Sequence, residues 1–280
     1  MCVYQLSETN LESDKKDITP SELNKIIDEY TAKEFFVKWC SELLSEKDSL
    51  QRTFSQVIAM YANDPFCLLS SYKVLSKADK LYRSRYYKKE DAETKFNFQC
   101  DKECNDNEFL GFEKEECGAP PSSKCIDGRC NRSGISFLYL SNNPKTSIEE
   151  LSPKKNDFIS VAEFHPIRNL KIFNLSTDNM HVYDDKTEYW WLHSFIRQIE
   201  LLYQKPVNEN TKEEYKICQT ITEIIKQLRF DGVAYSSSKA SVSQKEGLNY
   251  AMFDTELCEP VSSKLFKIED MKIDYYPGKY

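Results

Sequence analysis

Short apolar segments with the composition of β-strands recur from residue 80 onward, and their order restricts the fold more than any other feature. They cover residues 81–87, 135–140, 158–164, 170–175, 233–235, 248–253 and 264–268. Two stretches with helical spacing of apolar residues, 189–202 and 213–228, interrupt them. A doubly wound sheet requires strands and helices to alternate regularly, and here they do not. We therefore predict an α+β fold with a mixed β core and flanking helices.

Residues 1–79 differ from the rest and are predicted to form a small helical region ahead of a second domain at 80–280. Thr19, followed by Pro20 and Glu22, is typical of a helix start. Apolar residues then recur at helical spacing in two stretches: Leu23, Ile26, Ile27, Tyr30, Val37, Cys40, Leu43 and Leu44, and then Leu50, Phe54, Val57, Ile58 and Tyr61. We interpret both stripes as core packing.

The polar segment 88–130 is predicted to be a long loop with a rigid turn, GAPP, at residues 118–121. Five cysteines lie in it: Cys100, Cys104, Cys117, Cys125 and Cys130. Their spacing is irregular and contains no CxxC pair, so it matches no usual zinc pattern. We expect reduced thiols and no metal site.

Charge and hydropathy exclude several classes of function. The net charge of -7 disfavours direct binding to nucleic acid, because an acidic chain gains no affinity from counterion release. No segment reaches the roughly 18 consecutive apolar residues of a membrane span. Residues 1–5 lack the basic start and apolar run of a signal peptide. We therefore expect a cytoplasmic protein without a membrane partner.

The chain lacks the common signatures of nucleophilic and nucleotide sites. Its histidines, His165, His181 and His193, have no motif around them, and Ser237 lies in a serine run without the GxSxG elbow of a nucleophile. Neither a GxGxxG sequence nor a P-loop is present. If a nucleotide binds, it does so without either phosphate cradle.

Polar residues at the ends of apolar strands are the remaining candidates for chemistry. Arg83 lies within a strand otherwise rich in aromatic and apolar residues, and Glu150 follows a strand, a turn and the start of a short helix. Each also has an ordinary explanation. Arg83 could pair with Glu150, and Glu149 and Glu150 could be solvated helix surface.

Five blocks of sequence, in order, strongly resemble the RES-domain family, the toxin half of a group of bacterial toxin–antitoxin pairs. The most specific is GRCNRSGISFLYLSNNPKTSIEEL at 128–151. The others are LYRSR at 81–85, FISVAEFHPIRNLKIFNLS at 158–176, EYKICQTITEIIKQLRFDGVAYSSS at 214–238 and LNYAMFD at 248–254. The resemblance implies an ADP-ribosyltransferase-like fold, NAD as the substrate, no cofactor, and a DNA-binding antitoxin of the Xre type as partner.

The family is named for an Arg, a Glu and a Ser, which match Arg83, Glu150 (rather than Glu149) and Ser237. Cleavage of the nicotinamide–ribose bond passes through an oxocarbenium-like ribosyl cation, and nicotinamide leaves as a neutral molecule. The site therefore needs no general acid, but it needs a preorganised negative charge near the ribose. The resemblance assigns that charge to Glu150.

The resemblance also implies a set of NAD-binding residues: Arg129, Asn131, Tyr139 and Asn249. Arginine suits the pyrophosphate because its guanidinium offers planar, bidentate donors. Arg83 and Arg129 are therefore expected to bind it, and Tyr139 to stack on the nicotinamide ring. Ser237 and Asn249 are expected to hold the nicotinamide amide or the ribose by hydrogen bonds.

Two assignments stay open. Ser236 stands where the family often has proline, so the site serine could be Ser236, Ser237 or Ser238. The Cys-rich insertion at 98–125 leaves the alignment between Arg83 and Arg129 loose, so Arg85, which strand alternation sends to the same face, could exchange roles with Arg83.

Three functions are compatible with the sequence. The chain could cleave NAD by hydrolysis, or by phosphorolysis with inorganic phosphate as second substrate. It could instead transfer ADP-ribose to a protein or small-molecule acceptor. A third possibility is an inactive interaction module whose working surface is the helical N-terminal region.

Overall fold

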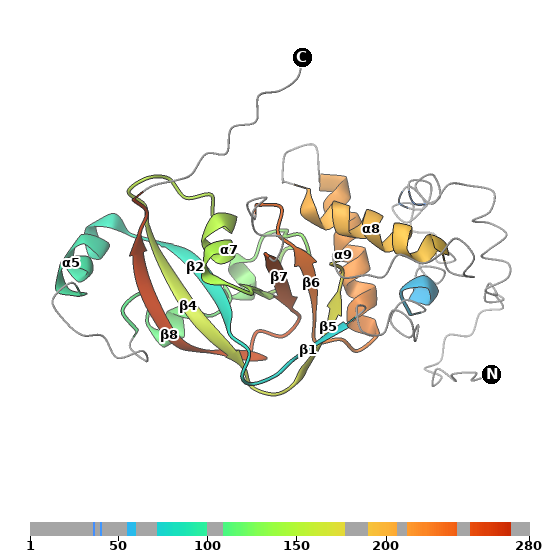
Figure 1. Ribbon diagram of the computed structural model, residues 1–280, viewed down its shortest axis with the longest axis horizontal. Coiled ribbons are helices and arrows are strands. Elements are labelled where there is room, and N and C mark those ends of the chain that lie inside the picture. The colour runs from blue at the N-terminus through green and yellow to red at the C-terminus, as the bar shows by residue number, and fades with distance from the viewer. Residues whose placement is uncertain are drawn as a thin grey trace, which may run out of the picture.

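A single eight-stranded sheet forms the centre of the structure, which is a computed structural model (Figure 1). The structure describes Phe36, Cys40 and residues 55–59, 72–99, 109–176, 190–205, 212–239 and 247–269. The strands run in the order β1-β5-β6-β7-β3-β2-β4-β8. Their bounds are β1 Tyr72–Leu75, β2 Leu81–Tyr87, β3 Leu138–Ser141, β4 Phe158–Pro166, β5 Leu170–Asn174, β6 Gly232–Ser236, β7 Leu248–Met252 and β8 Cys258–Lys267.

The strand pairing is antiparallel throughout the sheet except between β5 and β6, which run parallel. A mixed, mostly antiparallel sheet with helices beside it is an α+β fold, so the predicted class is confirmed. β2 and β3 share only the pair Tyr82–Ser141, so the sheet is least closely paired at this point. The candidate site lies there.

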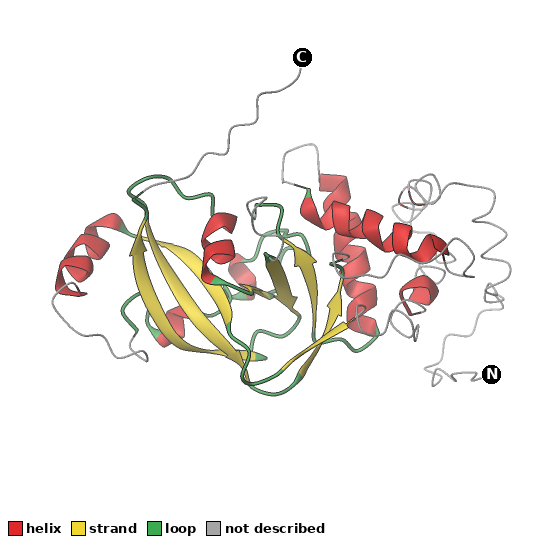
Figure 2. Ribbon diagram, viewed as in Figure 1, coloured by secondary structure: helices red, strands yellow, loops and turns green. Residues whose placement is uncertain are grey.

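Helices lie against several parts of the sheet (Figure 2). α8 (Trp190–Gln204) and α9 (Lys212–Gln227) lie beside β5 and β6 and bury an apolar face against them. The short helix α7 (Pro144–Glu150) packs on β2, β3 and β4. No helix of the described ranges is both long and apolar enough to cross a membrane.

The predicted strands and the two long helices are found within a few residues of their expected bounds, except that β8 begins earlier, at Cys258. The predicted long loop at 88–130 is wrong in part. It contains α5 (Lys89–Gln99), α6 (Lys114–Cys117) and a 3₁₀ turn, η1 (Ser122–Lys124). α5 was not predicted because its sequence shows no helical spacing of apolar residues. Among residues 89–94, Ala92 is the buried one and the others are exposed.

The N-terminal region contributes directly to the fold of the remainder. β1 pairs with β5, so the boundary predicted between residues 79 and 80 falls between two strands of one sheet. Val57 and Ile58 are fully buried in the core cluster that also contains Phe195. Phe36 and Cys40 are helical, and Phe36 is buried in the same cluster. Apart from these two and residues 55–59, the helices predicted for residues 19–61 lie outside the described residues.

Candidate functional site

Glu150 is the last residue of α7, and the preceding turn determines its position. The Asn143 side chain accepts a hydrogen bond from the Thr146 backbone amide (2.8 Å), and Pro144 occupies the first turn of the helix. Both features are typical of a helix start. Ser147 donates to Ser84 of β2 (2.8 Å), which fastens α7 to the sheet.

The Glu150 carboxylate is held by donors from two other segments. Its Oε1 accepts hydrogen bonds from Ser237 Oγ (2.5 Å) and from Asn249 Nδ2 (2.6 Å). Ser141 Oγ donates to the amide oxygen of Asn249 (2.8 Å), which fixes the direction of that amide. Glu149 instead lies 3.7 Å from Lys145 of its own helix. The structure thus brings together Glu150, Ser237 and Asn249, which are far apart in the sequence.

A hollow of about 280 Å³ opens beside this carboxylate. Its wall comes from β2, β3, α7, β6 and β7: Tyr82, Arg83, Ser84, Tyr139, Leu140, Ser141, Ser147, Glu150, Leu151, Tyr235 and Asn249. Burial raises the pKa of Tyr139 and of Tyr235 well above the usual value, so both hydroxyls stay protonated at neutral pH. The hollow therefore combines aromatic rings, one carboxylate and one guanidinium.

Arg83 lines the hollow, but α6 holds its guanidinium. Arg83 Nη1 donates to the backbone oxygen of Cys117 (2.9 Å), and Arg85 Nη1 donates to that of Glu116 (2.5 Å). Both arginines thus reach the same helix, as strand alternation predicts. Burial, together with repulsion by Arg85, lowers the pKa of Arg83 to about 10, so it remains charged at neutral pH. The sequence allowed an ion pair between Arg83 and Glu150. Among the described residues, these two side chains do not form one.

Asn131 is tied into its own loop and does not line the hollow. It is 5% exposed, and its Nδ2 donates to the backbone oxygens of Ile126, Arg132 and Ile135. Its Oδ1 accepts from the Tyr139 hydroxyl (2.7 Å). The structure therefore places Asn131 behind Tyr139, where it fixes the tyrosine that lines the hollow.

Gly128 leaves the space that this arrangement needs. A Cβ at this position would lie 2.3 Å from Asn131 Oδ1 and 3.0 Å from the Tyr139 hydroxyl. Asn131 cannot turn aside without losing its own hydrogen bonds. We expect Gly128→Ala to lower the free energy of unfolding by about 1–3 kcal/mol, the usual cost of overpacking. Urea unfolding measures this, with Gly118→Ala as control because a Cβ there meets nothing within 4 Å. Equal stability of the two variants would contradict the explanation.

Arg129 also lies behind the hollow. Its Nη2 donates to the backbone oxygen of Lys205 at the end of α8 (2.6 Å), and its guanidinium lies 5.5 Å from the centre of the Tyr235 ring. It does not line the hollow and contacts the site through Tyr235.

The serine run is divided between two partners. Ser236 donates to Glu200 of α8 (2.6 Å), Ser237 donates to Glu150, and Ser238 is exposed. Of the three, Ser237 is the one that contacts the carboxylate. Lys239, which sequence reasoning missed, donates from Nζ to the backbone oxygen of Glu150 (2.8 Å) and to Ser152 Oγ (2.7 Å). It joins the end of the run to the end of α7.

The described histidine and cysteine side chains lie away from the hollow. His165 Nε2 lies 2.9 Å from Glu163 on β4. His181, the His193 side chain, Cys100 and Cys104 fall outside the described residues. Cys117, Cys125 and Cys130 are buried free thiols, and burial raises the pKa of Cys117 to about 11. Within the described ranges, no group of three or more His, Cys, Asp or Glu residues is placed to hold a metal ion.

Comparisons with known proteins complete the description of the site. A family model, that of the RES domain, matches residues 113–270 of the chain, more than half of its length. A comparison with curated proteins found no match. Among solved structures, one similar chain belongs to the crystal structure of the M. tuberculosis MbcT–MbcA toxin–antitoxin complex. It is 9% identical with a TM-score of 0.39, over 76% of this chain and 92% of that one. A likeness of this size supports no inference about activity.

Proposed function

The chain belongs to the RES-domain family, and from this premise we propose that it cleaves the nicotinamide–ribose bond of NAD, with Glu150 as the essential carboxylate. One observation carries the proposal. Glu150 is fixed by Ser237 and Asn249 at the wall of a hollow that is also lined by three tyrosines and Arg83. A preorganised anion beside an aromatic surface suits a substrate that carries a positive charge in both its ground and transition states.

The chemistry requires little acid–base work from the protein. When the bond from ribose C1′ to the pyridinium nitrogen breaks, its electron pair stays on nicotinamide, which leaves uncharged. The ribosyl group becomes an oxocarbenium-like cation. Glu150 stabilises that cation by charge, and the two neutral donors on its Oε1 keep it in place without removing the charge. Water then adds to C1′ and releases one proton to the solvent, or an oxygen of inorganic phosphate adds to C1′ instead.

The rest of the hollow accounts for binding. The face of Tyr139 favours the pyridinium by cation–π attraction, whereas the Tyr235 ring already lies beside the Arg129 guanidinium. Arg83 supplies the positive charge for the pyrophosphate. The volume of about 280 Å³ lies just below the roughly 300–1,000 Å³ of pockets for drug-sized ligands, so the nicotinamide riboside end is the part that enters. In this assignment Asn131 lies behind Tyr139 and Arg129 lies behind Tyr235, and neither contacts the pyrophosphate.

We further propose, from family membership, that the protein is the toxin of a bacterial toxin–antitoxin system. It would act on the NAD of the cytoplasm, and its partner would be a DNA-binding antitoxin of the Xre type. Expression of the chain alone should then arrest growth and deplete NAD, and co-expression of the neighbouring gene should restore both. Growth arrest with normal NAD would argue against this role.

Direct measurement of nicotinamide release tests the proposed activity. Purified, folded protein is incubated with NAD, with and without phosphate, and the products are separated by chromatography. Hydrolysis predicts nicotinamide and ADP-ribose in both conditions. Phosphorolysis predicts an ADP-ribose phosphate and a strict need for phosphate. Label from NAD that becomes attached to a lysate component would indicate transfer instead. Absence of nicotinamide at enzyme concentrations equal to that of NAD would refute the proposal.

A further inference from the structure

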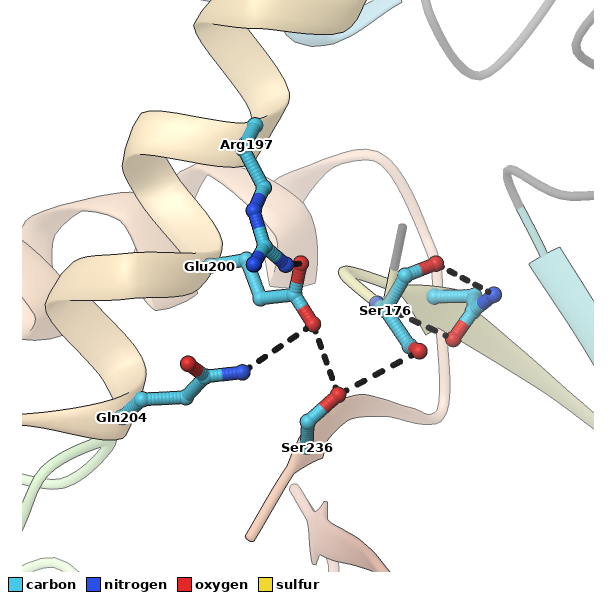
Figure 3. Close-up of polar contacts among 6 residues, drawn as sticks. Ser176, Arg197, Glu200, Gln204 and Ser236 are labelled. Carbon is cyan, nitrogen blue, oxygen red and sulfur yellow. Dashed lines mark hydrogen bonds and ion pairs between the residues drawn. The ribbon is translucent and has the colours of Figure 1, made fainter. Parts of the chain in front are cut away.

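Glu200 is a fully buried carboxylate between α8 and the sheet (Figure 3). It is 0% exposed and lies beside Ile199 and Tyr203, both also fully buried. Its position belongs to the apolar stripe of α8, where a leucine would remove the cost of burying a charge. A carboxylate here therefore calls for a reason other than stability.

The contacts of Glu200 connect α8 to β6. Arg197 Nη1 lies 2.6 Å from Oε2, and Gln204 Nε2 donates to Oε1 (3.2 Å), both from the same helix. Ser236 contacts the same carboxylate from outside the helix: its Oγ donates to Oε1 (2.6 Å). Ser176, just after β5, lies 3.3 Å from the same hydroxyl (Figure 3).

Ser236 stands between two residues of the candidate site. Tyr235 before it lines the hollow, and Ser237 after it donates to Glu150. β6 ends at Ser236, where its pairing with Leu248 of β7 is the last of the ladder. One backbone hydrogen bond follows that pair, from Ser237 N to Gly247 O (2.7 Å). The side-chain contact with Glu200 acts together with this bond to set the direction of the chain as it enters Ser237.

We propose that Glu200 is a positioning residue for NAD cleavage, and this inference rests on the proposed function. By holding Ser236, it fixes the end of β6, so that Ser237 meets Glu150 and Tyr235 faces the hollow. A small displacement of groups held in a reactive geometry can cost tenfold to about a hundredfold in rate. Loss of the Glu200–Ser236 contact should therefore reduce kcat more than it raises KM.

Four variants test the proposal in the full-length protein: Glu200→Leu, Glu200→Gln, Ser236→Ala and the double variant Glu200→Leu/Ser236→Ala. We expect Glu200→Leu and Ser236→Ala each to lower kcat for nicotinamide release about tenfold or more, with little change in KM. Glu200→Gln should restore most of kcat, because its amide oxygen still accepts from Ser236. The double variant should be no slower than the slower single variant, because either substitution alone already removes the contact between Glu200 and Ser236.

Melting temperature separates positioning from a loss of folding. Glu200→Leu removes the buried carboxylate and leaves Arg197, whose side chain is 41% exposed and can be hydrated, so no buried charge loses its partner and the variant should remain folded with impaired kcat. If it unfolds, Ser236→Ala and Glu200→Gln still give the comparison. Gln204→Ala is the matched control, because it removes a donor to Glu200 without touching β6. Its kcat should equal that of the wild type.

The outcomes distinguish this inference from the activity on which it rests. Folded Ser236→Ala or Glu200→Leu with wild-type kcat would overturn the positioning role alone, as would multiplicative losses in the double variant. Absence of nicotinamide release from the wild type would overturn the proposed function and the positioning role with it.

Discussion

Glu150→Gln is expected to lower kcat for nicotinamide release by about a hundred- to a thousand-fold. Glutamine keeps the shape of the side chain and can still accept a hydrogen bond from Asn249, but it removes the negative charge beside the ribosyl cation. Loss of one preorganised electrostatic contact typically costs about 3–4 kcal/mol of transition-state stabilisation. Rates at saturating NAD measure the effect, and circular dichroism verifies that the variant is folded.

Glu149→Gln is the matched control, one residue earlier on α7. Glu149 faces Lys145, and the two side chains are 24% and 53% exposed, so this partly exposed pair contributes at most about 1 kcal/mol to stability. Its kcat should stay at the wild-type value. If Glu149→Gln abolished activity while Glu150→Gln did not, the carboxylate would have been assigned to the wrong residue.

The strands of the fold were predictable because their sequences carry their own signal. β7, for example, is buried along its whole length, and its apolar run stands out. β1 has one buried residue, Leu75, and α5 has no apolar stripe, so neither had a signal to find. The order of the strands in the sheet could not be predicted from the sequence. β3, for example, lies between β2 and β7, and these pairings join segments that are far apart in the chain.

The site was predictable only where a residue type indicates its own chemistry. Glu150 follows a recognisable strand, turn and helix start, and the family resemblance supplied Ser237 and Asn249. Lys239 was missed because an exposed lysine after a serine run has the appearance of solvated surface. Glu200 did leave a signal: with Ile196, Ile199 and Tyr203 it completes an apolar stripe at spacings of three and four residues. A carboxylate in such a stripe is an exception that requires a partner.

The second large expected effect is a loss of stability when the packing of the N-terminal region against α8 and α9 is disturbed. Ile58→Ala should lower the free energy of unfolding by about 2–5 kcal/mol, because Ile58 is fully buried in the same core as Phe195 of α8 and Ile221 of α9. Urea unfolding followed by fluorescence and circular dichroism measures the change. Gln56→Ala, on the same helix and only partly buried, should cost about 0.5 kcal/mol or less.

The form of the transition decides whether residues 1–79 are a separate unit. If they were, Ile58→Ala would create a second, earlier transition and leave that of the sheet unchanged. Because Ile58 shares a core with α8 and α9, and β1 pairs with β5, we expect one transition that shifts as a whole.

For the same reason a fragment that begins at residue 80 should fail to fold. It would expose the edge of β5 and the core surface that Val57 and Ile58 cover, and α8, which carries Glu200, would lose part of its support.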